Sequence, residues 1–79
     1  MNLKEARFRH NLTQYDVSLI TGIHQSRISL IESGYILPAE EENQNLAKAL
    51  GVDPGELEFE LKTVGSPWHA VDNTYITNN

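Results

Sequence analysis

The stretch that decides the fold runs from Thr13 to Gly34 and reads TQYDVSLITGIHQSRISLIESG. Thr13 is a favourable N-cap residue, and Asp16 stands three positions later, where an acid can complete a capping box. This pattern predicts a helix over residues 14–21. Gly22 follows at once and suits a sharp turn that needs a positive φ angle.

A second helix is predicted over residues 25–33 and is closed by Gly34. The apolar residues that can be buried together across the two helices are Val17, Ile23, Ile28 and Ile31. If these residues are buried, the residues that remain for the outer face or the start of the second helix are Gln25, Ser26, Arg27, Ser29 and Leu30. Two short helices joined by a glycine turn are the pattern of a helix-turn-helix, in which the second helix enters the major groove of DNA.

The flanking sequence adds three further predicted helices. The first begins after the N-cap Asn2 and ends near Asn11, a residue suited to a left-handed conformation. The fourth covers residues 39–50, with carboxylates at its positive N-terminus. The fifth begins after Asp53 and carries Leu57 and Leu61. We therefore predict an all-α, five-helix domain over residues 1–61. Residues 62–79 are predicted to be a flexible or partner-dependent tail.

Length and composition narrow the class of protein. A chain of 79 residues, 39% of them hydrophobic, has room for one small core. The absence of Cys excludes disulfides, thiolate zinc sites and a cysteine nucleophile. No apolar stretch approaches the roughly 20 residues of a membrane span, so we expect a cytoplasmic protein without membrane contact.

The net charge of −5 argues at first against a nucleic-acid partner. The charges are unevenly distributed, however. Residues 1–34 hold four basic and three acidic side chains, whereas residues 35–61 hold one basic and seven acidic. The first half of the chain can therefore face a polyanion, and the second half cannot.

No arrangement of residues points to catalysis or to a cofactor. Ser, His and acidic residues do not converge credibly, and no Gly-rich loop follows a strand. His69 and Asp72 are at most half of a metal site, in the predicted tail. We expect a protein that is not an enzyme and that needs no cofactor and no metal.

The sequence resembles the Cro/CI-type (XRE-like) helix-turn-helix family of transcriptional regulators. The resemblance is carried by Leu12-Thr13-Gln14, Thr21-Gly22-Ile23, Gln25-Ser26-Arg27-Ile28-Ser29 and Ile31-Glu32-Ser33-Gly34, and it continues through Pro38 and Leu46–Val52 to Leu57. It covers residues 3 to about 61 without a gap. It implies a lambda-repressor-like domain of five helices that binds operator DNA as a homodimer.

The resemblance also implies roles for single residues. Gln14 matches a glutamine that contacts a phosphate and braces the recognition helix. Gln25, Ser26 and Arg27 match base-reading positions, and Leu30 matches the next outward position. Arg7 and Glu32 match a structural pair that ties the first helix to the third. The side-chain chemistry agrees, since Gln can pair with adenine, Arg with guanine, and Leu can meet a thymine methyl group.

Three more residues are candidates for contact with DNA. His24 stands where Ser or Thr commonly caps the recognition helix, and it can cap weakly or meet a phosphate. Ser29 shares the outer face of that helix. Tyr35 opens the following loop, which often touches the DNA backbone.

Some residues depart from the family pattern and support an alternative. Phe8 and Leu19 lie where the family is often polar, whereas Glu40 and Asn43 lie where many members place core residues. Together with Leu30, the apolar residues Phe8 and Leu19 can mark a protein-binding surface. The alternative is a protein-interaction or antitoxin-like subunit with weak DNA affinity. Its partner would bind these apolar residues and the tail, which contains Trp68 and Tyr75.

Overall fold

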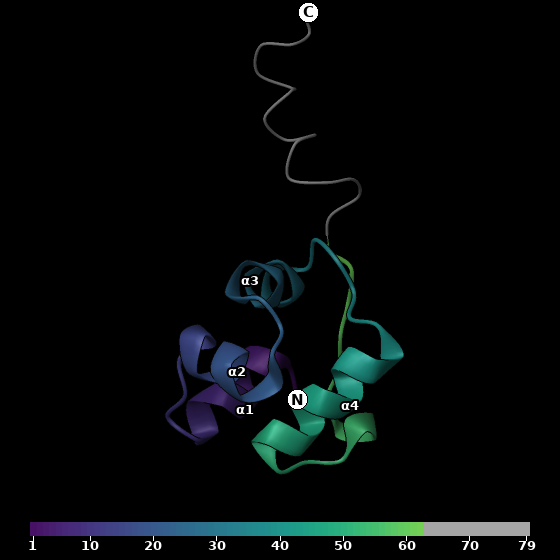
Figure 1. Cartoon of the computed structure of the whole chain (residues 1–79). Coiled ribbons are helices and arrows are strands. Elements are labelled where there is room, and N and C mark those ends of the chain that lie inside the picture. Colours follow the sequence, from purple (N-terminus) through teal and green to yellow (C-terminus); the bar gives the residue numbers. More distant parts are fainter. Residues whose placement is uncertain (63–79) are drawn as a thin grey trace, which may run out of the picture.

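The computed structural model describes residues 1–62, and this part of the chain contains helices and no strand. Four α-helices are followed by one short 3-10 helix, η1 (Figure 1). Their bounds are α1 Leu3–Arg9, α2 Gln14–Thr21, α3 Gln25–Ser33, α4 Glu40–Leu50 and η1 Pro54–Glu56. The predicted all-α class is confirmed, and the first four helices lie close to their predicted ranges.

Local hydrogen bonds determine where the first two helices begin. The Asn2 side chain accepts from the backbone N–H of Glu5 at 2.8 Å, and the Glu5 carboxylate accepts from the N–H of Asn2 at 3.0 Å. Thr13 and Asp16 form the same reciprocal pair at 3.0 and 2.9 Å. Such capping boxes satisfy donors that a helix leaves free at its start. Gly22 has a φ of 79° and allows the chain to turn from α2 towards α3.

The core is built by one apolar face from each helix. Val17, Ile28 and Leu46 have no exposed surface, and they come from α2, α3 and α4. The remaining buried hydrophobic residues are Leu3, Ala6, Ile23, Ile31, Ala47, Leu50 and Leu57. The predicted joint burial of Val17, Ile23, Ile28 and Ile31 is confirmed. This shared burial holds α2 and α3 at a fixed mutual angle.

The first turn of α4 packs less completely than the rest of that helix. Glu40 is exposed and Asn43 is half-buried. The Oδ1 atom of Asn43 is buried and has no hydrogen-bond partner. The first turn of α4 therefore adds no buried apolar side chain to the core, which this helix reaches through Leu46, Ala47 and Leu50.

The prediction of a fifth α-helix was wrong. Only the single turn Pro54–Glu56 is helical, and the backbone of Leu57 is extended, with φ −87° and ψ 125°. Residues 57–61 alternate apolar and acidic side chains, and this period of two favours an extended chain. Leu57 is buried, whereas Leu61 is 52% exposed.

The extended segment 57–62 runs back across the domain from α4 towards the loop between α3 and α4 (Figure 1). The N–H of Glu58 donates to the carbonyl of Met1, and the N–H of Lys62 donates to the carbonyl of Gly34, both at 2.9 Å. A Cβ atom added to Gly34 would lie 2.8 Å from the Cβ of Lys62. Gly34 therefore both ends α3 and leaves space for this segment.

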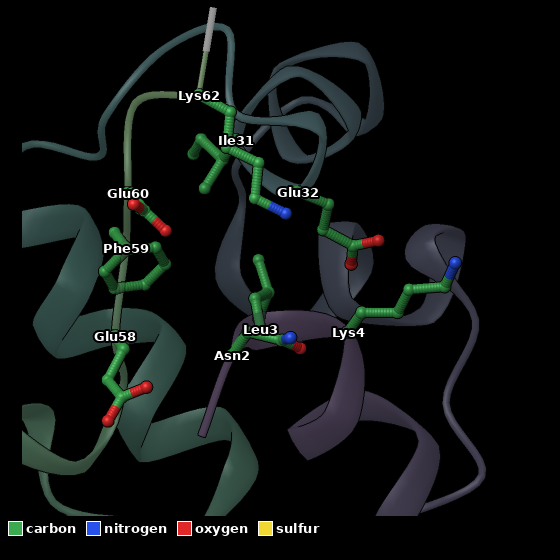
Figure 2. A pocket seen from close by; sticks show the side chains of 9 residues that line it. All are labelled: Asn2, Leu3, Lys4, Ile31, Glu32, Glu58, Phe59, Glu60 and Lys62. Carbon is green, nitrogen blue, oxygen red and sulfur yellow. The ribbon is translucent and has the colours of Figure 1, made fainter.

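The segment forms one wall of an open groove of about 320 Å³, shown in Figure 2. The opposite wall comes from the start of α1 and the end of α3. The charged side chains that line it are Lys4, Glu32, Glu58, Glu60 and Lys62. The groove lies away from the first turn of α3.

Within residues 1–62, none of the helices has the length and apolar character needed to cross a membrane. The tail predicted for residues 62–79, with Trp68 and Tyr75, falls beyond the described residues apart from Lys62, and so does the half-site of His69 and Asp72.

Candidate nucleic-acid interface

The first turn of α3 lies on the surface of the domain. Ile28 and Ile31 turn inward and pack on the core, whereas Gln25 and Ser26 are exposed. Ser29 and Leu30 are half-buried on the next turn. The helix thus offers an outward row of polar side chains from its N-terminus, supported by a buried face.

His24 caps this helix. Its Nδ1 atom accepts from the backbone N–H of Ser26 at 3.2 Å and lies 2.9 Å from the Ser26 hydroxyl. His24 and Ser26 are therefore two residues of the predicted site that the structure brings into direct contact.

Arg27 points to the first turn of α4 and forms an ion pair with Glu42. Its Nε donates to Oε2 at 2.5 Å and its Nη2 donates to Oε1 at 2.9 Å. Hydrogen bonding to Arg27, and then the backbone N–H of Ala39, hold the pKa of the Glu42 carboxyl below its ordinary range. Hydrogen bonding to Glu42 raises the pKa of Arg27.

Glu42 is the residue of this site that sequence reasoning missed. The sequence assigns the run Glu40–Glu42 to a solvated helix start, and Glu40 and Glu41 are indeed exposed. Glu42 differs because its side chain turns towards α3. The partners are 15 residues apart and lie on different helices, so no local periodicity signals their contact.

A second polar cluster joins α1, α2 and α3 beneath the surface. Arg7 donates from Nε and Nη2 to the Glu32 carboxylate at 2.7 and 3.0 Å. Its Nη1 donates to the carbonyl of Leu12 at 2.9 Å. Gln14 donates from its amide to Glu32 at 3.1 Å. Glu32 on α3 is therefore held by one residue from α1 and one from α2.

The predicted site residues do not all converge on one point. Gln14 is directed to Glu32, and Arg27 is directed to Glu42. Tyr35 is half-buried, and its N–H donates to the carbonyl of Leu30 at 3.0 Å, which ends α3. The site residues that lie together on the surface are those at the start of α3, namely His24, Gln25 and Ser26, with Arg27 beside them.

No group of three His, Cys, Asp or Glu side chains within residues 1–62 is placed to hold a metal ion. The exposed chemistry of this surface consists of amide, hydroxyl, imidazole and guanidinium groups. These groups donate to phosphates and to base edges.

Two short helices joined by a glycine turn, with the second helix exposed along its outer side, define a helix-turn-helix DNA-binding domain. Residues 3–57 match the family model described as helix-turn-helix, and the chain belongs to this family, which is of the Cro/CI type. Its members are in general DNA-binding regulators of transcription and are not typically enzymes. No curated protein and no solved structure matches the chain.

Proposed function

We propose that this protein binds specific sequences in double-stranded DNA as a homodimer, with α3 in the major groove, and represses transcription by occupying a promoter. The observation that carries this proposal is the exposed first turn of α3. Its side chains Gln25 and Ser26 are free to face DNA, while Ile28 and Ile31 anchor the same helix in the core.

Each outward side chain of α3 has a matching chemical group on DNA. Gln25 can pair with adenine and Arg27 with guanine. Ser26 and Ser29 can donate to a base edge or a phosphate, and Leu30 can contact a thymine methyl group. We assign these residues to contacts with base edges and with the phosphates next to those bases.

Contacts with the DNA backbone are assigned to residues at the edges of the helix-turn-helix. His24 caps α3 through Nδ1 and keeps its other ring nitrogen for a phosphate. Gln14 uses its amide on Glu32, and its second amide hydrogen can reach a phosphate. Tyr35 lies in the loop that leaves α3. Such contacts fix the position of a protein on DNA without reading its sequence.

The dimer follows from the small size of the reading element. Helix α3 has nine residues and reads only a few base pairs. Two copies on half-sites about one helical turn apart would read an inverted repeat. We place the dimer contact after α4, in the extended segment 57–62 with its exposed Leu61 and in the chain that follows.

Selection of bound sequences from a random duplex pool at near-physiological salt tests the proposal. We expect enrichment of an inverted repeat whose half-site reflects Gln25, Ser26 and Arg27. Enrichment of a single half-site would contradict the symmetric dimer. An absence of enrichment, even at low salt, would overturn the proposed function of this chain.

Replacing Arg27 with Ala should relax the preference at one base position of the half-site. The expected loss of discrimination there is about 1–3 kcal/mol, because a bidentate contact to one base would be removed. Binding to the selected duplex and to single-base variants measures this effect. Arg9→Ala, at an exposed position on α1, is the control. Equal weakening on every sequence would instead make Arg27 a phosphate contact.

A second candidate function is a protein-interaction module on the same fold. Phe8 and Leu19 are 58% and 66% exposed, so two large apolar side chains on α1 and α2 face solvent. Their exposure supports this alternative. If selection yields no DNA sequence, co-purification of a defined protein that is lost in Leu19→Ser would support it.

A further inference from the structure

The Arg27–Glu42 ion pair occupies only one edge of the guanidinium group. The two hydrogen bonds use Nε and Nη2, which together form its side edge. A guanidinium carries five N–H donors in a planar fork. The other edge, formed by Nη1 and the second hydrogen of Nη2, stays free, since Nη1 has no hydrogen-bond partner within residues 1–62. The Arg27 side chain is 43% exposed.

Glu42 is itself fixed in place. It stands in the first turn of α4, and its Oε1 accepts from the backbone N–H of Ala39 at 2.8 Å. Its side chain is 20% exposed, which is half the exposure of its partner. The carboxylate is thus anchored to the start of a helix whose later turns lie in the core, and it offers Arg27 a rigid acceptor.

We propose that Glu42 is a positioning residue that aims the free edge of Arg27 at a guanine. This inference rests on the proposed function. Guanine presents N7 and O6 as two acceptors in the major groove, and they match a two-pronged arginine donor. A side chain that is already held in its binding geometry loses less conformational freedom on association than a free one.

The geometry favours positioning over masking. A carboxylate that blocked base reading directly would occupy the edge of the guanidinium group that pairs with guanine. Here the carboxylate occupies the side edge and leaves the base-reading edge open. The negative charge of Glu42 also repels phosphate, so the residue lowers the affinity for all DNA while it sharpens the choice of base.

The test compares Glu42→Gln with Glu41→Gln in the full chain. Glu41 is the adjacent, exposed residue, so its replacement makes the same change in net charge without touching Arg27. Gln at position 42 can still accept from Ala39 but gives Arg27 a single neutral acceptor. Each variant is titrated with two duplexes. The first is the duplex selected by the wild type. The second is identical except that the guanine whose preference is lost in Arg27→Ala is replaced by another base.

The measured quantity is the dissociation constant for the duplex with the replaced guanine, divided by the dissociation constant for the selected duplex. We expect Glu42→Gln to lower this ratio by about threefold to tenfold relative to Glu41→Gln, which is part of the discrimination of a bidentate base contact. An unchanged ratio would show that Glu42 only caps α4. A higher affinity for the selected duplex with an unchanged ratio would show that Glu42 masks Arg27. Either result would overturn the proposal.

Glu42→Asp provides a second variant that keeps the charge and the capping chemistry. The shorter acid can still bond the Ala39 N–H, as Asp16 bonds that of Thr13, but it draws back from Arg27. The same fall in the ratio is expected, and an unchanged ratio would again overturn the proposal. A wild-type protein that selects no sequence would instead remove the proposed function itself.

Discussion

At the scale of single residues, Arg7 carries the clearest structural role. Its side chain is buried, and all its guanidinium nitrogens donate hydrogen bonds, two to Glu32 and one to Leu12. A buried ion pair contributes little net stability when complete, but a single remaining charge is costly. Arg7 and Glu32 therefore hold α1 against α3 and do not serve the surface.

Replacing Arg7 with Leu should lower the free energy of unfolding by about 3–5 kcal/mol, because the Glu32 carboxylate would stay buried without its partner. Urea unfolding followed by circular dichroism measures the change. The double variant Arg7→Leu/Glu32→Leu should recover most of the loss. A loss of less than about 1 kcal/mol in the single variant would mean that Glu32 reaches water or that Gln14 suffices as its partner.

At the scale of elements, the helix ends are decided by a few side chains. The N-cap of α3 is His24, whereas Ser, Thr, Asp and Asn are the residues preferred at such positions. The hydrogen bond from Ser26 to the imidazole is long, at 3.2 Å. The helix proposed to read DNA therefore begins with a weaker cap than α2, which begins with Thr13.

Replacing His24 with Ser should raise the free energy of unfolding by about 0.5–1 kcal/mol, because a hydroxyl is a better cap acceptor. Thermal unfolding at neutral pH measures the gain. His10→Ser, at an exposed position that caps no helix start, is the control and should leave the stability unchanged. A lower stability in His24→Ser would show that the imidazole stabilises α3 through more than its cap.

Residues 57–62 show how an element can depart from its local signals. Asp53, Pro54 and Glu56 are typical of a helix start, and the Glu56 side chain does accept from the N–H of Asp53 at 3.0 Å. The helix nevertheless ends after one turn. The backbone of the following residues bonds to Met1 and Gly34 instead, so tertiary contacts outweigh the capping signal.

At the scale of the whole molecule, the excess of acidic side chains affects the stability of the fold as well as the binding of DNA. The net charge is −5, and the pKa of Glu42 is lowered by its hydrogen bonds to Arg27 and Ala39. A carboxyl whose pKa is lowered in the folded state stabilises the fold at pH values above its ordinary pKa of 4.5. That contribution is lost as the pH falls through the lowered pKa, when Glu42 takes up a proton and its bond to Arg27 weakens.

The domain should therefore be less stable at about pH 3 than at pH 7, and Glu42→Gln should lose less stability over this interval than the wild type. Urea unfolding at both pH values measures the difference. Glu41→Gln, at an exposed position, should follow the wild type. An equal loss in Glu42→Gln and the wild type would show that the ion pair does not contribute to acid sensitivity.

Local signals along the chain are sufficient to predict the four helices between Leu3 and Leu50 and the buried face of α2 and α3. Caps such as Thr13 with Asp16, turns such as Gly22, and apolar periodicity act within a few residues, so they can be recognised along the chain. The same local signals indicated which side of α3 faces outward.

Contacts between distant parts of the chain depend on how the helices pack. Tertiary packing paired Arg27 with Glu42 and drew residues 57–62 out of a helix. Each of these outcomes depends on partners at least 15 residues distant in the chain. Such contacts arise only when packed helices bring the two groups to hydrogen-bond distance, so no local pattern of residues contains them.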